Sequence, residues 1–139
     1  MKKAVGIAVL IVLLLSQSIT AEEERIVVVE SIGEYTVTAY CACEKCCGKW
    51  AAKQGETVKG AYGIPLESGV SIASPLPKNT VIYIEGVGRL ICHDKTSKWV
   101  ADKYHNRIID IYFDTHKKAV AFAKQKLEVY MPKYETVFE

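Results

Sequence analysis

The spacing of apolar positions along this chain predicts a mainly β protein. Residues 34–40 alternate between polar and apolar side chains, which is typical of a strand with one buried face. A β-branched run at residues 25–30 could pair as a further strand or remain a linker. Short apolar runs predict other strands at residues 70–73, 81–85, 89–93, 107–113 and 126–131.

Turn and cap signals lie between these runs. The two prolines within residues 74–79 predict a turn, because proline has no backbone N–H for a strand ladder. Glycines at both ends of residues 86–88 predict a hairpin. Asp114 or Thr115 can cap a helix over about residues 116–125, which has one apolar face.

The remaining segments are two loops. Residues 41–69 form a long Cys-rich loop, and residues 95–106 form a shorter polar loop. Six or seven short strands with one helix, no internal repeat and no linker favour a closed barrel over a sandwich. We therefore expect a mainly β, six-stranded barrel with one short helix and a long Cys-rich loop.

The N-terminal segment predicts export. Lys2 and Lys3 precede an apolar run at residues 4–15 and a region of small polar residues, the order of a cleaved signal peptide. The apolar run is short for a membrane span, which needs about 20 residues, so an uncleaved anchor is the alternative. No cysteine stands directly after this run to accept a lipid. We expect a secreted or cell-envelope protein with no stable membrane insertion after cleavage, divided into a signal peptide (1–21), a leader (22–33), a barrel domain (34–131) and a tail (132–139).

The charge of the chain is nearly balanced. The sequence has 18 Lys and Arg against 16 Asp and Glu, and the two sets become equal once Lys2 and Lys3 are removed. This balance gives no electrostatic support for binding nucleic acid. Attraction to an anionic wall polymer would have to come from local patches. We expect a monomer.

All five cysteines lie after the predicted signal peptide. Export permits disulfides, but an odd number leaves one thiol over or points to a metal site. Neighbouring cysteines rarely bridge each other, so the distant Cys92 is the natural partner for one member of the cluster. We expect structural disulfides, with a zinc site or free thiols as alternatives, among Cys41, Cys43, Cys46, Cys47 and Cys92.

Two aspartates border apolar strand positions. Asp94 follows the predicted strand at 89–93, and Asp110 lies between isoleucines in the strand at 107–113. A carboxylate that is poorly solvated has a raised pKa, which suits general acid catalysis. The structural alternatives are an ion pair between Asp110 and Arg107 or a lysine, and a turn role for Asp94. His93 could orient Asp94 or bind a metal with a thiolate.

The order of motifs resembles the three-aspartate domain, the catalytic double-psi β-barrel shared with membrane-bound lytic transglycosylase A. The resemblance covers about residues 34–131 and rests on the segment from Tyr35 to Trp50 with its Cys-x-Cys-x-x-Cys-Cys run, the segment 71–84, Gly86-x-Gly88, the Asp94 and Asp110 segments, and Phe122 with Val129-Tyr130.

The chain departs from the family pattern at three places. Ser74 stands where the family usually has its first aspartate. Residues 95–99 replace an expected Gly-rich stretch, and one extra isoleucine splits the Asn-Arg-Ile-Asp match that ends at Asp110. These departures leave a second hypothesis open, a wall-binding barrel without catalytic activity.

The resemblance implies cleavage of the bond between N-acetylmuramic acid and N-acetylglucosamine in peptidoglycan glycan strands, without a cofactor or an active-site metal. It implies that Asp110 is the acid/base and that Asp94 is its electrostatic neighbour. Aromatic side chains in loops could stack on sugar rings. We expect substrate contacts at Trp99, Tyr62, Ser74 and Lys78.

Overall fold

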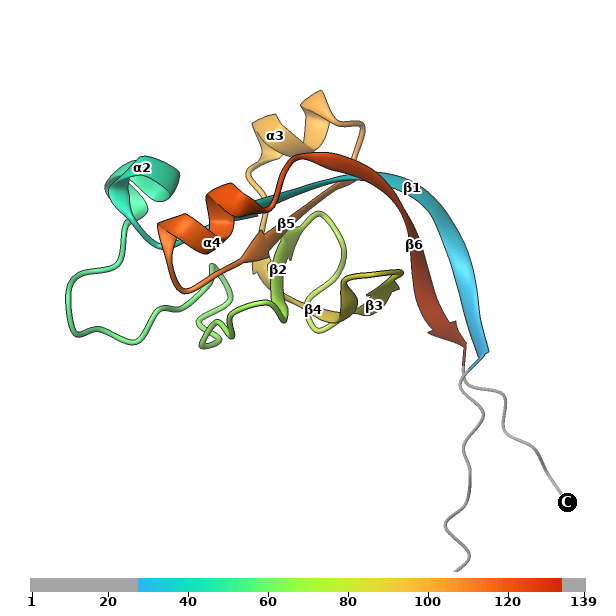
Figure 1. Ribbon diagram of the computed structural model, residues 1–139, viewed down its shortest axis with the longest axis horizontal. Coiled ribbons are helices and arrows are strands. Elements are labelled where there is room, and N and C mark those ends of the chain that lie inside the picture. The colour runs from blue at the N-terminus through green and yellow to red at the C-terminus, as the bar shows by residue number, and fades with distance from the viewer. Residues whose placement is uncertain (1–27, 134–139) are drawn as a thin grey trace, which may run out of the picture.

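The computed structural model describes residues 28–133 of the 139-residue chain as a closed six-stranded barrel (Figure 1). The predicted signal peptide at 1–21 lies outside the described residues, as do residues 22–27 of the leader and 134–139 of the tail. Within the described range, no helix is both long enough and apolar enough to cross a membrane.

Six strands close the barrel in the order β1-β5-β2-β4-β3-β6. The β1–β5 and β2–β4 pairs are parallel and the others are antiparallel, a mixed topology that is compatible with a double-psi barrel. Closure leaves no strand edge unpaired along the ring. The strands are β1 (Val28–Tyr40), β2 (Ser71–Ser74), β3 (Val81–Ile84), β4 (Gly88–Lys95), β5 (Ile108–Tyr112) and β6 (Gln125–Lys133).

The predicted strands are confirmed, and β1 is longer than expected. It begins at Val28, so part of the leader belongs to the barrel, and its ladder with β6 shifts register between Ser31 and Gly33. Gly33 has a φ of 102°, which explains why a glycine stands at this irregularity. The predicted hairpin joins β3 to β4.

Residues 28–133 contain three short α-helices where the sequence predicted one. The predicted helix is α4 (His116–Ala121), and the Thr115 side chain caps it by accepting a hydrogen bond from the Lys118 N–H. In the segment expected to be a polar loop, Ser97 caps α3 (Lys98–Lys103) in the same way. The Cys-rich loop contains α2 (Glu44–Cys47), followed by the 3-10 turn η1 (Gly48–Trp50).

The core consists of β-branched and aliphatic side chains that point into the barrel. Alternate residues of each strand supply it, as in Ile109 and Ile111 of β5, so the residue between them, Asp110, faces outward. Members with no exposed surface are Val37, Ile72, Ile82, Leu90, Cys92, Ile109, Ile111 and Val129.

Shortening a core side chain should lower the free energy of unfolding and leave the outer face of the barrel unchanged. Ile82 is fully buried in β3, and Ile82→Ala should lower the free energy of unfolding by about 2–5 kcal/mol through lost burial and a cavity. The control Val120→Ala removes an exposed side chain and should change it by less than about 0.5 kcal/mol. Urea denaturation measures both; equal losses would contradict this account of the core.

Candidate active site

The pairing of three strands brings the two predicted aspartates to one outer face of the barrel. Ala73 of β2 pairs with Asp94 of β4 on one side and with Asp110 of β5 on the other. Thr38 of β1 pairs with Asp110 from the far side of β5. Residues paired directly across a ladder project to the same face, so these four side chains form one row. The small Ala73 side chain leaves open space between the two carboxylates.

Asp94 is held by three hydrogen-bond donors. Its Oδ1 accepts hydrogen bonds from the backbone N–H of Ala61 at 2.6 Å and of Lys95 at 2.8 Å. Its Oδ2 accepts one from the Tyr40 hydroxyl at 2.7 Å. Three donors, shared between both carboxylate oxygens, fix the position of this side chain.

Gly60 lets the Cys-rich loop reach Asp94. A Cβ at this position would lie 2.7 Å from the Asp94 Cβ and 2.6 Å from the His93 carbonyl oxygen. Only glycine therefore allows the loop backbone close enough for the Ala61 N–H to donate to the carboxylate.

Asp110 has the electrostatic environment of a general acid. Burial raises its pKa, a 3.0 Å hydrogen bond from the Thr38 hydroxyl lowers it, and the Asp94 charge raises it again, so that the pKa lies at about 6. The side chain remains partly exposed, so a substrate can reach it. Of the ion pairs in residues 28–133, none includes Asp110, and Arg107 instead donates to the carbonyl oxygens of Ile32 and Glu34. The predicted alternative of an ion pair with Arg107 is therefore wrong.

Tyr40, the last residue of β1, connects this strand to Asp94 through its hydroxyl. Burial and the hydrogen bond to Asp94 raise the pKa of its phenol, so the hydroxyl stays protonated and keeps donating. Its ring packs edge-on against Tyr112, with ring centroids 5.6 Å apart.

The row formed by Thr38, Ala73, Asp94 and Asp110 lines an open cleft of about 360 Å³. One wall is α3 with Trp99, and another is the end of α2 with Cys46 and Cys47. Trp99 is 70% exposed, so its ring is available at the rim, where the Lys103 ammonium lies 5.2 Å from the ring centroid. The cleft residues on the strands are Thr38, Tyr40, Ala73, Asp94, Lys95, Ile108 and Asp110.

The other residues expected to contact substrate are placed less favourably. Tyr62 lies on the turn after Gly60, with the Lys78 ammonium 5.9 Å from its ring centroid, and neither residue lines the cleft. Ser74 is completely buried, and its hydroxyl accepts a hydrogen bond from the Leu76 N–H. The expectation of a substrate contact at Ser74 is corrected, because its side chain has no exposed surface.

Two further polar residues have structural roles. His93 forms a 2.8 Å hydrogen bond to the Ser71 hydroxyl through Nδ1, and no hydrogen bond among the described residues joins its ring to Asp94. Asp114 forms a 2.9 Å ion pair with Lys118, which lowers the pKa of the carboxyl. Asp114 therefore stabilises the start of α4.

The cysteines form no disulfide. All five thiols are free, so the prediction of structural disulfides is wrong for this structure. Cys92, the expected distant partner, is buried in β4 with its Sγ 3.4 Å from the carbonyl oxygens of Leu76 and Asp94. Cys47 hydrogen-bonds to the Cys41 carbonyl oxygen and lines the cleft.

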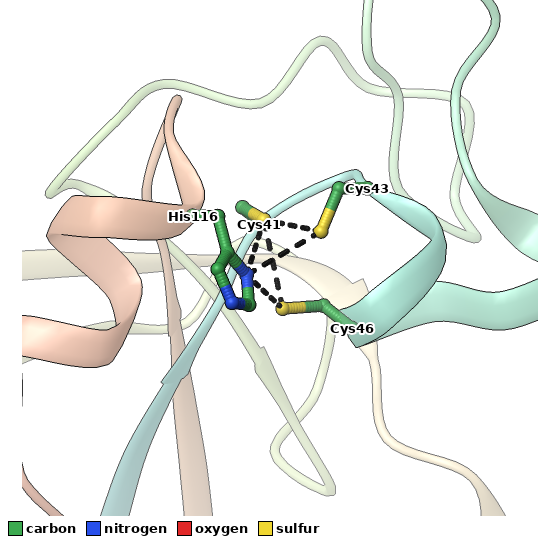
Figure 2. A group of neighbouring side chains, drawn as sticks. All are labelled: Cys41, Cys43, Cys46 and His116. Atoms are coloured by element: carbon green, nitrogen blue, oxygen red, sulfur yellow. Dashed lines mark hydrogen bonds between the residues drawn. The ribbon is translucent and has the colours of Figure 1, made fainter.

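The other three sulfur atoms converge on a histidine that the sequence analysis missed. The Sγ atoms of Cys41, Cys43 and Cys46 and one ring nitrogen of His116 all lie within 4.8 Å of one another (Figure 2). A histidine far along the chain from a Cys-x-Cys-x-x-Cys run is a metal-ligand signal that could have identified it. The cluster lies beside the cleft, because Cys46 belongs to both.

Comparison with known proteins gives no assignment. No protein-family model and no curated protein gives a significant match to this chain.

The raised pKa of Asp110 should make stability depend on pH in a defined direction. Between its ordinary value of 3.8 and about 6, the folded protein keeps a proton that the unfolded chain releases, so stability falls as pH rises through this window. Asp110→Asn removes the effect and should be more stable than the wild type by about 1–2 kcal/mol at pH 7, but not at pH 3.5. Urea denaturation at both pH values measures the difference. Asp102→Asn, at an exposed site, is the matched control, and the same pH dependence in wild type and Asp110→Asn would contradict the assignment.

Proposed function

We propose that this protein cleaves peptidoglycan glycan strands by lytic transglycosylase chemistry, with Asp110 as the acid/base. The observation that carries the proposal is a carboxyl with a pKa of about 6 in an open cleft, across one small residue from a carboxylate held by three donors. The family resemblance of the sequence supplies the substrate class.

Each proton has a place in this reaction. Asp110 donates its proton to the glycosidic oxygen as the bond from that oxygen to the anomeric carbon breaks. The muramyl 6-hydroxyl oxygen then bonds to the same carbon and gives its proton back to Asp110. The products are a free hydroxyl on the leaving sugar and a 1,6-anhydro ring. No water is consumed, so a single acid/base is sufficient.

Asp94 is proposed to act through its charge. An anion near the anomeric carbon stabilises the positive charge that develops there, and it also helps to keep Asp110 protonated. The donors of Asp94 come from β1, the Gly60 turn and its own strand, so the anion is fixed before substrate arrives. The buried Ser74, where the family usually has an aspartate, supplies no further acid.

The surroundings of the cleft fit a charged polymer. Trp99 offers an exposed aromatic face at the rim for a sugar ring. A second hollow of about 600 Å³ also includes Lys103 and Tyr104 and is bordered by Arg107, Lys124 and Lys126. These cations could receive the carboxylates of peptide stems on the same glycan strand. The predicted export would place the protein with this substrate in the cell envelope, where we propose that it acts as a monomer.

A non-catalytic wall-binding barrel is the second candidate. The specific observation in its favour is the buried serine at position 74. Binding to purified cell walls without release of soluble fragments would identify this function.

Digestion of purified sacculi should release fragments with anhydro ends, detected by mass spectrometry. Asp110→Asn should lower the rate at least about 100-fold, because it removes the transferable proton. Asp102→Asn keeps both cleft aspartates and should retain the rate. The absence of release by the wild type would contradict catalysis, and fragments with a free reducing end would indicate a hydrolase.

The pH profile of this release should shift in opposite directions in two variants. The rate should fall above about pH 6, where Asp110 loses its proton. Thr38→Val removes the hydrogen bond that lowers this pKa, so the falling limb should move to higher pH. Asp94→Asn removes a charge that raises it, so the limb should move to lower pH, with a lower rate as well. Shifts of the same sign in both variants would contradict the assignment of the limb to Asp110.

A further inference from the structure

We propose that Cys41, Cys43, Cys46 and His116 bind one zinc ion in a closed structural site. Cys41 follows the last residue of β1, Cys43 is the N-cap of α2, and Cys46 lies within α2. His116 is the first residue of α4. Figure 2 shows the four side chains pointing toward one common centre. The inference does not depend on the proposed glycan cleavage.

The distances within the cluster fit a tetrahedral ion. The His116 Nδ1 lies 3.7, 3.4 and 3.5 Å from the sulfur atoms of Cys41, Cys43 and Cys46. A tetrahedral zinc with Zn–S bonds of about 2.3 Å and a Zn–N bond of about 2.0 Å requires S···N separations of about 3.5 Å. The Cys41 sulfur lies 3.1 Å from that of Cys43 and 3.5 Å from that of Cys46, somewhat inside the corresponding S···S separation of about 3.8 Å. A small outward movement of the thiols would therefore admit the ion.

The donor set selects zinc and a structural role. Three thiolates and one imidazole are ligands that zinc prefers, whereas magnesium and calcium require oxygen. Four protein ligands complete a tetrahedral shell and leave no position open for water, as in structural sites. Binding displaces one proton from each of the three thiols, so the occupied site carries one net negative charge.

The surrounding segment has little else to hold it in place. Neither α2 nor η1 contains a buried residue, and each is a single turn. A segment without a core of its own needs a cross-link, and a metal supplies one without oxidising the thiols. The ion would join the end of β1 and α2 to α4, across the sequence from residue 41 to residue 116.

The cross-link would also support one wall of the cleft. Tyr40, the donor to Asp94, immediately precedes Cys41, and Cys46 and Cys47 line the cleft. Loss of the metal should therefore loosen this wall while leaving the barrel core intact.

Metal content measures the proposal directly. The full chain, purified without chelators, should contain about one zinc per molecule by elemental mass spectrometry. Cys43→Ser and His116→Ala should lose most of it. Cys47→Ser is the matched control, because this thiol lies in the same run but outside the cluster, and it should retain zinc.

A replacement that restores a ligand separates metal binding from folding. His116→Cys supplies a fourth thiolate and should keep zinc where His116→Ala loses it. Cobalt in place of zinc should give the intense visible absorption of a tetrahedral thiolate site in the wild type and in Cys47→Ser. A metal-free wild type, with a mass reduced by two hydrogen atoms under non-reducing conditions, would overturn the proposal in favour of a disulfide. Equal zinc content in wild type, Cys43→Ser and His116→Ala would overturn it as well.

Discussion

The hydrogen bonds to Asp94 join the segments that form the candidate site. This carboxylate accepts hydrogen bonds from the Tyr40 hydroxyl at the end of β1, from the Ala61 N–H in the Cys-rich loop and from the Lys95 N–H in its own strand. The same charge contributes to the raised pKa of Asp110 on the other side of β2. Removing this charge would therefore change both the packing of the loop and the protonation of the neighbouring carboxyl.

Strand positions could be predicted from the sequence because burial alternates along them. In β5, Ile109 and Ile111 enter the core and Asp110 faces outward, which is the alternation that the sequence shows. The helix α3 was missed because only Ala101 of its six residues is buried, so it has no apolar stripe. Its cap, Ser97, was the one local signal available.

The site could be predicted only where its residues lie on regular strands. Asp94 and Asp110 were identified, and the ladders place both beside Ala73. Tyr40 and Thr38 were missed as partners, because which strands become neighbours in a barrel with crossovers is not contained in local periodicity. The same reason hid His116, which meets the cysteines only through the packing of α4 near β1. The prediction of disulfides was wrong because the spacing of cysteines along the chain does not determine which thiols lie together.

The length of β1 has a consequence for where the cleft lies relative to the Val28 end of the strand. Figure 1 shows β1 and β6 running side by side as a long ribbon. The first residue of β1, Val28, pairs with Lys133, and its last residue, Tyr40, donates a hydrogen bond to Asp94. Thirteen strand residues span at most about 40 Å. The paired β1–β6 ribbon therefore separates the Val28 end of the barrel from the cleft. The length of β1 therefore determines how far the cleft lies from the Val28 end of the barrel.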